Sequence, residues 1–199
     1  MPGRPRSDSS WGGIAVVVGT SDMVTRDQAL VRRLTDMIND SYGHRRISDR
    51  EVASRLSHGD RGSCANRVLH LAFRDGALAG CCSSTIQPPF TCCCCGHWGL
   101  LAVAREAQGA GVASALVAAA ERRLAAAGCA AVQIEYEYEV GDEFSERLRQ
   151  WYEGRLGFRC LSGAPGSAAG RREFRLCHKL VRPTGCSHCC HLCGSCVVS

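Results

Sequence analysis

The residues best suited to chemistry form a glycine-containing turn between an apolar strand and an alanine-rich helix. The strand is expected at Leu100–Val103, the turn reads Gln108-Gly109-Ala110-Gly111, and the helix follows at once. Glycine has no Cβ, so a ligand can approach the main chain closely there. The first amides of a helix lack intrahelical partners and lie at the positive end of its dipole. The segment therefore predicts a phosphate-binding turn, with a tight turn that uses its glycines only for geometry as the alternative.

Two common phosphate-binding motifs do not fit this turn. No Gly-Lys-Ser/Thr follows, as a Walker loop requires, and the third glycine of a dinucleotide fingerprint is missing. The sequence QGAGVA, with LAV on the preceding strand and LV shortly after it, instead resembles the acyl-CoA signature of the GNAT N-acetyltransferase superfamily. That signature is Gln or Arg, two residues, Gly, one residue, then Gly or Ala. It falls here on Gln108, Gly111 and Ala113.

A second motif, WYEGRLGF, strengthens the resemblance, because the family carries a helix with a Tyr shortly before Gly-Phe. The usual gap from that Tyr to the Gly is four residues, whereas Tyr152 to Gly157 is five. The resemblance covers roughly Ile14–Pro183. It implies an α/β (α+β) GNAT acyl-CoA N-acyltransferase fold, with a mixed, mostly antiparallel central sheet flanked by helices. A splayed strand pair would form the CoA slot.

The resemblance also implies where acetyl-CoA, the acyl-donor co-substrate, should bind. The pantetheine arm should lie along the strand and the pyrophosphate on the amides of the turn, and Tyr152 is the candidate general acid for the CoA sulfur. No metal is implied. The expected cofactor-binding residues are Leu101, Ala102, Val103, Gln108, Gly109, Ala110, Gly111, Val112, Ala113 and Ser114.

The reaction itself sets the other requirements. An alkyl amine with a pKa of about 10.4 is protonated at pH 7, and removing that proton costs roughly 4–5 kcal/mol. A base, or a water chain leading to one, is therefore needed. The thiolate leaving group departs readily with a pKa of about 8.5. Holding thioester and amine together can supply about 7–11 kcal/mol, so direct attack in a ternary complex needs no protein nucleophile and no metal.

The candidate general base is Glu135, acting through water from the strand Ala130–Glu139. Glu137 on the same face and His97 on the neighbouring strand are alternative bases. The non-catalytic alternative is that the glutamates only form a solvated face of the strand. An acidic row would favour a cationic amine as acceptor. Its members are Glu135, Glu137, Glu139, Asp142 and Glu143.

Local patterns predict the remaining elements. Ser48 and Glu51 have the spacing of a capping box, and Asp75-Gly76 suits the tight turn of a hairpin. Gly128 should end the alanine-rich helix. The other expected elements are strand Ile14–Val18, a helix from about Val24 to Ser41 capped by Ser21 or Asp22, a helix from Ser48 to about Leu56, a loop from His58 to Cys64, hairpin strands RVLHLAFR and ALAGCCSSTI, a helix over Phe144–Arg155, a loop over Ser162–Gly170 and a strand over Arg172–Val181.

Composition sets the domain organisation and excludes some partners. The 199 residues divide into a disordered N-terminal tail at 1–12, the GNAT domain at 13–183 and a cysteine-rich C-terminal tail at 184–199. A scattered net charge of +5 gives little case for nucleic acid as a partner. No apolar run reaches about 18 residues and no secretory signal is visible. Nine of the 15 cysteines cluster at Cys92–Cys95 and Cys186–Cys196, and adjacent cysteines rarely crosslink a core, so the reducing cytoplasm is expected rather than a disulfide framework.

The tail TGCSHCCHLCGSCVVS has three interpretations. Cys196-Val197-Val198-Ser199 fits a prenylation box, which predicts peripheral membrane association. One lipid binds membranes only marginally, so a second signal is needed, and palmitoylation could supply it. The candidates for palmitoylation are Cys186, Cys189, Cys190 and Cys193. A metal site, or a tail without a role, are the alternatives.

The sequence thus predicts an N-acetyltransferase that transfers an acetyl group from acetyl-CoA to a primary amine of a small molecule or protein. The alternative is a catalytically idle GNAT fold that serves as an acyl-CoA-binding or membrane-tethered interaction module.

Overall fold

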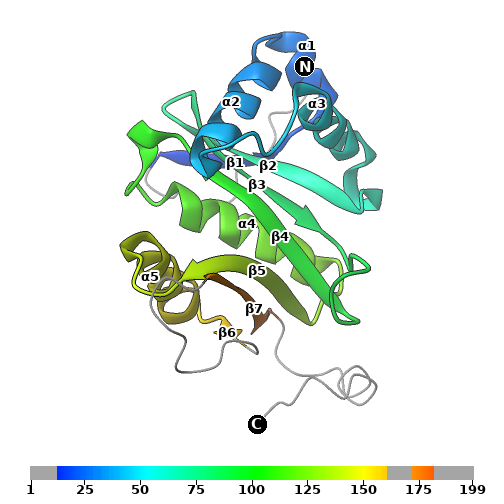
Figure 1. Cartoon of the computed structure of the whole chain (residues 1–199). Coiled ribbons are helices and arrows are strands. Elements are labelled where there is room, and N and C mark those ends of the chain that lie inside the picture. The colour runs from blue at the N-terminus through cyan, green and yellow to red at the C-terminus, as the bar shows by residue number, and fades with distance from the viewer. Residues whose placement is uncertain (1–12, 161–171, 182–199) are drawn as a thin grey trace. The chain divides into compact units, whose positions relative to one another are not determined.

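The computed structural model describes residues 13–160 and 172–181, which Figure 1 draws in colour. The expected N-terminal tail, the loop Ser162–Gly170 and the cysteine-rich tail lie outside the described residues. The lipid and metal interpretations of Cys186, Cys189, Cys190, Cys193 and Cys196 therefore stay predictions. Within the described ranges, no helix is both long enough and apolar enough to cross a membrane.

The chain forms two compact units. The first contains the residues up to Ile86 together with Trp98–Arg123, and the second contains Gln87–His97 and the residues from Leu124 onward. In all, seven strands are described. The pairs β1/β2, β2/β3, β5/β7 and β6/β7 are antiparallel and β4/β5 is parallel. The expected mixed, mostly antiparallel sheet with flanking helices is confirmed.

The first unit is built from the N-terminal half of the chain. Its elements are β1 (Ile14–Val18), α1 (Ser21–Arg26), α2 (Leu30–Tyr42), α3 (Asp49–His58), the 3-10 helix η1 (Gly59–Cys64), β2 (Arg67–Arg74), β3 (Ala77–Thr85), most of β4 (Cys95–Val103), the 3-10 helix η2 (Arg105–Ala107) and most of α4 (Val112–Ala126).

Two local predictions in this unit are confirmed. Asp75 and Gly76 both have positive φ angles, 50° and 80°, as a tight hairpin turn between β2 and β3 requires. Ser48 caps α3: its hydroxyl accepts the N–H of Glu51 at 3.4 Å, and the Glu51 carboxylate accepts the N–H of Ser48 at 2.9 Å. The Ser48 hydroxyl also lies 2.7 Å from the Glu51 carboxylate, and this bond, followed by the one from the Ser48 N–H, holds the pKa of Glu51 below its usual range.

The prediction of a single helix from about Val24 to Ser41 is wrong in one respect, because the segment forms two helices, α1 and α2, separated at Asp27. The Asp27 side chain accepts the N–H of Ala29 at 3.2 Å, and its carbonyl accepts that of Leu30 at 3.0 Å. An Asp that binds nearby amides competes with the helix. The expected cap is also wrong, since the Ser21 hydroxyl donates to Asp60 at 2.6 Å instead. The segment expected as a loop before Ala65 is the 3-10 helix η1.

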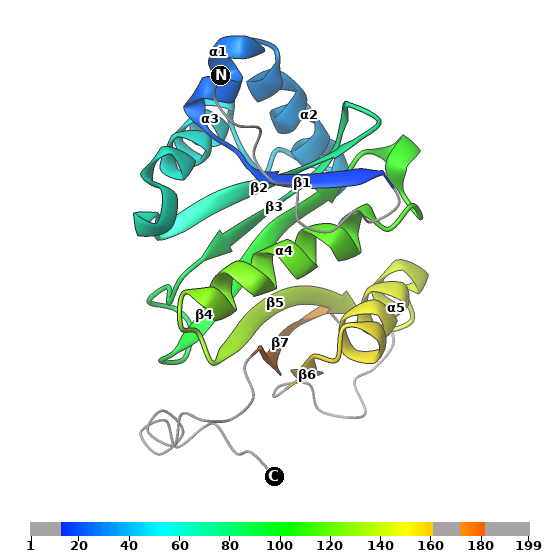
Figure 2. The same cartoon turned by 180° about the vertical axis from the view of Figure 1, so that it is seen from behind.

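The core of the first unit lies between β2 and β3 and the helices. Leu34, Ile38 and Leu56 of α2 and α3 pack on Leu69 and Leu71 of β2, and all five are fully buried. Figure 1 shows α2 and α3 side by side above these strands. Side chains alternate along a strand, so His70 faces the other way. It bonds Ser84, which also accepts a bond from Arg123 of α4, so α4 covers the opposite face (Figure 2).

The second unit joins the start of β4 to the C-terminal elements. These are the end of α4, β5 (Ala131–Glu139), α5 (Glu143–Arg149), the π-helical segment η3 (Gln150–Arg155), β6 (Arg159–Cys160) and β7 (Arg172–Leu180). The strand order in this unit is β4-β5-β7-β6. Gly128 ends α4 as predicted, with a φ of 94°. The two-residue strand β6 is not expected from the sequence.

The alternation predicted for β5 is confirmed. Val132, Ile134, Tyr136 and Tyr138 are buried on one face. On the other face Glu135 and Glu137 are exposed and Glu139 is half-buried, whereas Gln133 is buried. Its hydrogen-bonded pairing with β4 covers only Cys95–His97.

The expectation that cysteines stay unpaired in a reducing compartment does not hold for one pair in the structure, because Cys160 and Cys177 form a disulfide between β6 and β7. The two residues are direct partners in the antiparallel register. That register brings together two cysteines 17 positions apart, and their spacing in the sequence does not predict the pairing.

Candidate active site

The turn before α4 has the conformation that its glycines allow. Gly109 and Gly111 have φ angles of 77° and 89°, in the left-handed region where a side chain costs about 1–2 kcal/mol. A Cβ added at either glycine would meet no atom within 4 Å. The glycines are thus required by the backbone rather than by neighbouring protein atoms. The space beside them is open.

The main-chain donors at the start of α4 are available to a ligand. The first backbone bond that the helix makes at this end runs from the N–H of Ala115 to the carbonyl of Gly111, at 3.0 Å. Among the described residues, the N–H groups of Gly111–Ser114 have no backbone partner. They lie at the positive end of a helix of 15 residues. This arrangement can hold a phosphate or pyrophosphate group.

Close packing fixes the start of α4. Val112 and Leu116 are buried, with exposures of 1% and 0%. Opposite them stands Gly80 of β3, where an added Cβ would lie 2.8 Å from the Ala102 carbonyl oxygen and 2.9 Å from Val112. Gly80 therefore lets β4 and α4 approach β3 closely. Sequence reasoning missed this residue, although a glycine inside a strand pattern is a known signal for such an approach.

The expected pantetheine strand contains a bend. Leu100 in β4 has a φ of 49°, which is unusual for a large side chain. Its carbonyl lies 3.7 Å from the buried thiol of Cys81 in β3. Beyond the bend, Leu101 and Val103 are half-buried and Ala102 is buried. Strained backbone of this kind is held by its surroundings and is common at functional sites.

Tyr152 lies in η3, in the second unit. Its ring packs against those of Tyr136, at 4.8 Å between centroids, and Trp151, at 5.1 Å. The π-helical turn is marked by the bond from the N–H of Leu156 to the carbonyl of Trp151, at 2.9 Å. A π-turn takes one residue more than an α-turn. It thus accommodates the extra residue between Tyr152 and Gly157.

Tyr136 is held by a polar pair from two further elements. Its hydroxyl donates to Glu153 of η3 at 2.6 Å, and the Glu153 carboxylate lies 3.3 Å from Arg175 of β7. Burial, and then the bond to Glu153, raise the pKa of Tyr136 above its ordinary value. Sequence reasoning missed this set, because its members come from three separate elements.

Glu135 lies on the opposite face of β5 from Tyr136, and hence from the ring of Tyr152. Its neighbours Glu137 and Glu139 pair with Arg172, at 3.4 and 2.8 Å. Glu135 has no ion pair within the described part of the chain. The alternative base, His97, has its Nδ1 2.9 Å from the Gln133 carbonyl.

The predicted site residues fall into two groups. Leu101–Val103 and Gln108–Ser114 belong to the first unit, and Tyr152 and Glu135 to the second. The structure brings the strand residues close to the turn, and brings Tyr152 to Tyr136. It places Tyr152 and Glu135 on different faces of β5.

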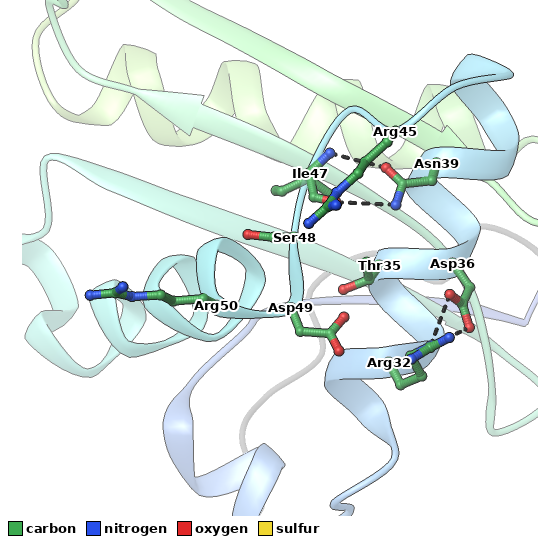
Figure 3. Close-up of a pocket in the computed structure, with 9 residues that line it drawn as sticks. All are labelled: Arg32, Thr35, Asp36, Asn39, Arg45, Ile47, Ser48, Asp49 and Arg50. Carbon is green, nitrogen blue, oxygen red and sulfur yellow. Dashed lines mark hydrogen bonds and ion pairs between the residues drawn. The ribbon is translucent and has the colours of Figure 1, made fainter.

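A hollow of about 480 Å³ lies elsewhere, between α2 and the segment that leads into α3 (Figure 3). Its polar groups largely satisfy one another. The Asn39 side chain accepts the N–H groups of Arg46 and Ile47, at 2.7 and 3.0 Å, and Arg32 pairs with Asp36 at 3.1 Å. None of the predicted site residues lines it. It is not part of the candidate active site.

Comparison with known proteins places this geometry in a family. The model of the acetyltransferase (GNAT) family matches residues 31–158. No curated protein matches the sequence significantly.

Similar solved structures include a GNAT acetyltransferase from Streptococcus pneumoniae, with a TM-score of 0.61 at 16% identity, covering 84% of this chain and 98% of that one. An aminoglycoside 6'-N-acetyltransferase complexed with coenzyme A gives 0.59 at 15% identity, with 84% and 98% covered. YncA from Salmonella typhimurium, solved with acetyl-CoA, gives 0.59 at 14% identity, with 87% and 97% covered. These structural similarities show a shared fold, and the match to the family model shows family membership. The chain belongs to the GNAT acetyltransferase family.

Proposed function

We propose that this protein is an acetyl-CoA-dependent N-acetyltransferase that acetylates a primary amine by direct attack in a ternary complex. The observation that carries the proposal is the turn at Gly109–Gly111, with open space beside it and N–H groups at Gly111–Ser114 that have no backbone partner among the described residues. Two solved structures with this fold contain CoA or acetyl-CoA.

Binding would divide between main chain and apolar side chains. The pyrophosphate of CoA carries negative charge, and a helix N-terminus stabilises each such charge by about 0.3–1 kcal/mol, or up to about 2 kcal/mol when partly buried. The pantetheine arm would follow Leu101–Val103, where the half-buried side chains of Leu101 and Val103 offer apolar contact. Charge and shape together select a CoA thioester over a free acyl group.

The chemistry would remove two protons from the nitrogen of the protonated acceptor, one before the attack and one after it, and deliver one proton to the leaving sulfur. The first proton passes through water to Glu135, which frees the amine. The amine nitrogen forms a bond to the thioester carbon and the carbon–sulfur bond breaks. The nitrogen then loses its second proton to solvent and Tyr152 protonates the departing thiolate, so the products are the amide, CoA thiol and one proton. A phenol with a pKa of about 10 gives its proton to a thiolate of about 8.5 at a cost of roughly 2 kcal/mol, which makes it a moderate acid.

Tyr152 is the proposed acid because it stands where the family carries a Tyr shortly before Gly-Phe. The hydroxyl of Tyr136, whose ring contacts that of Tyr152, donates to Glu153. Because the attacking nitrogen and the leaving sulfur are bonded to one carbon, and Glu135 lies on the other face of β5 from Tyr152, Glu135 would reach the nitrogen only through a chain of waters.

The acceptor we propose is a cationic amine. Arg172 compensates Glu137 and Glu139, whereas Glu135 is exposed and has no ion pair in residues 13–160 or 172–181. Its charge is therefore available to a second ammonium group of a substrate.

The test is release of CoA thiol from acetyl-CoA with matched amines, some neutral and some bearing an additional positive charge. Wild type should prefer the cationic amines. Glu135→Gln should remove most of this preference and lower turnover, and the paired neighbour Glu137→Gln should keep both. Equal rates on neutral and cationic amines would contradict the proposed substrate class, and the absence of any thiol release would contradict the proposed activity.

A further inference from the structure

A cluster of metal-ligating atoms lies in the second unit, apart from the phosphate-binding turn. Cys160 of β6, Cys177 of β7 and Glu153 of η3 each offer one ligand atom, and these atoms lie within 4.8 Å of one another. No other group of three His, Cys, Asp or Glu side chains meets this condition among the residues that the structure describes.

The ligand chemistry of the cluster depends on its redox state. In the structure the two sulfurs are joined, and the sulfur of Cys160 lies 3.5 Å from a carboxylate oxygen of Glu153. Reduction would leave two thiols and a carboxylate on one side of the β6/β7 pair. Thiolates and a carboxylate are ligands of Zn²⁺, with bonds of about 2.3 Å to sulfur and 2.0–2.2 Å to oxygen. Bonds of these lengths span the present separations after a small opening of the sulfur pair.

The charges around the cluster suit a divalent cation. Arg175 lies 3.3 Å from Glu153 and 3.7 Å from Glu173, with only 16% of its side chain exposed. Two thiolates and these two carboxylates carry four negative charges, against three positive ones on a divalent ion and the Arg175 guanidinium. Most of the charge is thus compensated, which lowers the cost of placing an ion beside the fully buried Cys177. Cys160 is partly exposed and 24% of the Glu153 side chain is exposed, which leaves a path for the ion and a water ligand.

We propose that the reduced Cys160 and Cys177 pair, with Glu153, binds a divalent cation of the Zn²⁺ class, and that oxidation to the disulfide closes this site. A dithiol reductant supplies the two electrons and two protons that convert the disulfide into two thiols, and is itself oxidised to a disulfide. Metal binding then releases the two thiol protons. The proposal is independent of the acetyltransferase activity.

Cobalt is a suitable probe, because Co²⁺ bound to thiolates absorbs strongly through charge transfer whereas aqueous Co²⁺ does not. The full chain would be used in a background in which the loop and tail cysteines are serine. These substitutions are at Cys64, Cys92, Cys93, Cys94, Cys186, Cys189, Cys190, Cys193 and Cys196. The reduced background protein should bind one equivalent of Co²⁺ with a thiolate band, and Zn²⁺ should displace it. The oxidised protein should give no band.

Substitutions in this background locate the site. Cys160→Ser and Cys177→Ser should each abolish the two-thiolate band, and Glu153→Gln should weaken Co²⁺ binding at least about tenfold, the loss seen even for outer-shell partners. Cys129→Ser, at another fully buried cysteine of the second unit, should leave binding unchanged. Circular dichroism would confirm folding, and Cys160→Ser and Glu153→Gln decide the matter if Cys177→Ser does not fold. A folded, reduced background protein without the band, or an unchanged band in Cys160→Ser, would overturn the proposal.

Discussion

The proposed phosphate-binding turn and the surroundings of Tyr152 are built in different ways. The turn offers main-chain N–H groups, and two left-handed glycines give it its shape. Tyr152 instead rests on Tyr136, which is held by Glu153 and Arg175. A site made of main-chain groups depends on residues that can adopt the required φ and ψ angles. A site made of side chains depends on each residue that holds another in place. The two regions should therefore respond to different substitutions.

Acid should weaken one of the side-chain contacts that support α4, the bond between His70 and Ser84, which also accepts a bond from Arg123. Burial, together with Arg123 and Arg122, lowers the pKa of His70 to about 4. The folded protein thus disfavours protonation, while the unfolded chain binds the proton below about pH 6.5. The stabilisation is complete above pH 6.5 and is lost as the pH falls toward 4. The free energy of unfolding should drop by about 3 kcal/mol over this window.

Urea denaturation at a series of pH values would measure this loss. His70→Gln keeps a polar group next to Ser84 but cannot titrate, so its stability should vary less with pH. His44→Gln, at an exposed histidine, should follow the wild type. A wild-type curve that is flat between pH 6.5 and 4.5 would contradict the buried, neutral state of His70.

Tyr152→Phe should separate the two regions by function. The ring contacts with Tyr136 and Trp151 are kept, and the hydroxyl proposed as the acid is lost. Turnover should fall about 100-fold, the lower end of general-acid effects, and acetyl-CoA affinity should change little. Tyr138→Phe, at a tyrosine of β5 whose hydroxyl donates to Glu146, is the control and should keep its turnover. An unchanged turnover in Tyr152→Phe, measured at saturating substrates, would rule out the acid role.

Glu153→Gln should show how far the side-chain region depends on charge. The change weakens the bond from Tyr136 and leaves Arg175, which is mostly buried, with only the Glu173 carboxylate, 3.7 Å away. Bonds to charged groups contribute about 1.5–3 kcal/mol, so about 2 kcal/mol of unfolding free energy should be lost. Glu143→Gln removes the exposed partner of Arg147 and should cost less than about 0.5 kcal/mol. Equal losses in the two variants would mean that burial of the Glu153 pair does not matter.

Predictability from sequence differs between the two regions for a physical reason. The turn, the Ser48 cap and the Asp75-Gly76 hairpin each depend on residues a few positions apart, and all could be placed. The break at Asp27 was missed, because a side chain that binds nearby amides leaves no change in apolar periodicity.

Longer-range features could not be predicted. The Tyr136, Glu153 and Arg175 set requires the register between β5 and β7, and the disulfide requires that between β6 and β7. The π-helical turn at Tyr152 adds one residue to a helix without changing its composition. The gap of five residues before Gly157 was its only trace in the sequence.

The most direct test of the account is acetyl-CoA binding by calorimetry in two glycine variants at opposite ends of α4. Gly111 and Gly128 have φ angles of 89° and 94°, and an added Cβ at either meets nothing within 4 Å. Glutamate should therefore strain both positions similarly, by about 1–2 kcal/mol. Only Gly111→Glu places a carboxylate at the proposed pyrophosphate site, where facing like charges cost several kcal/mol. We expect wild type and Gly128→Glu to bind acetyl-CoA alike, and folded Gly111→Glu to bind at least about 100-fold more weakly. Wild-type affinity in Gly111→Glu, or no binding by the wild type, would contradict the account.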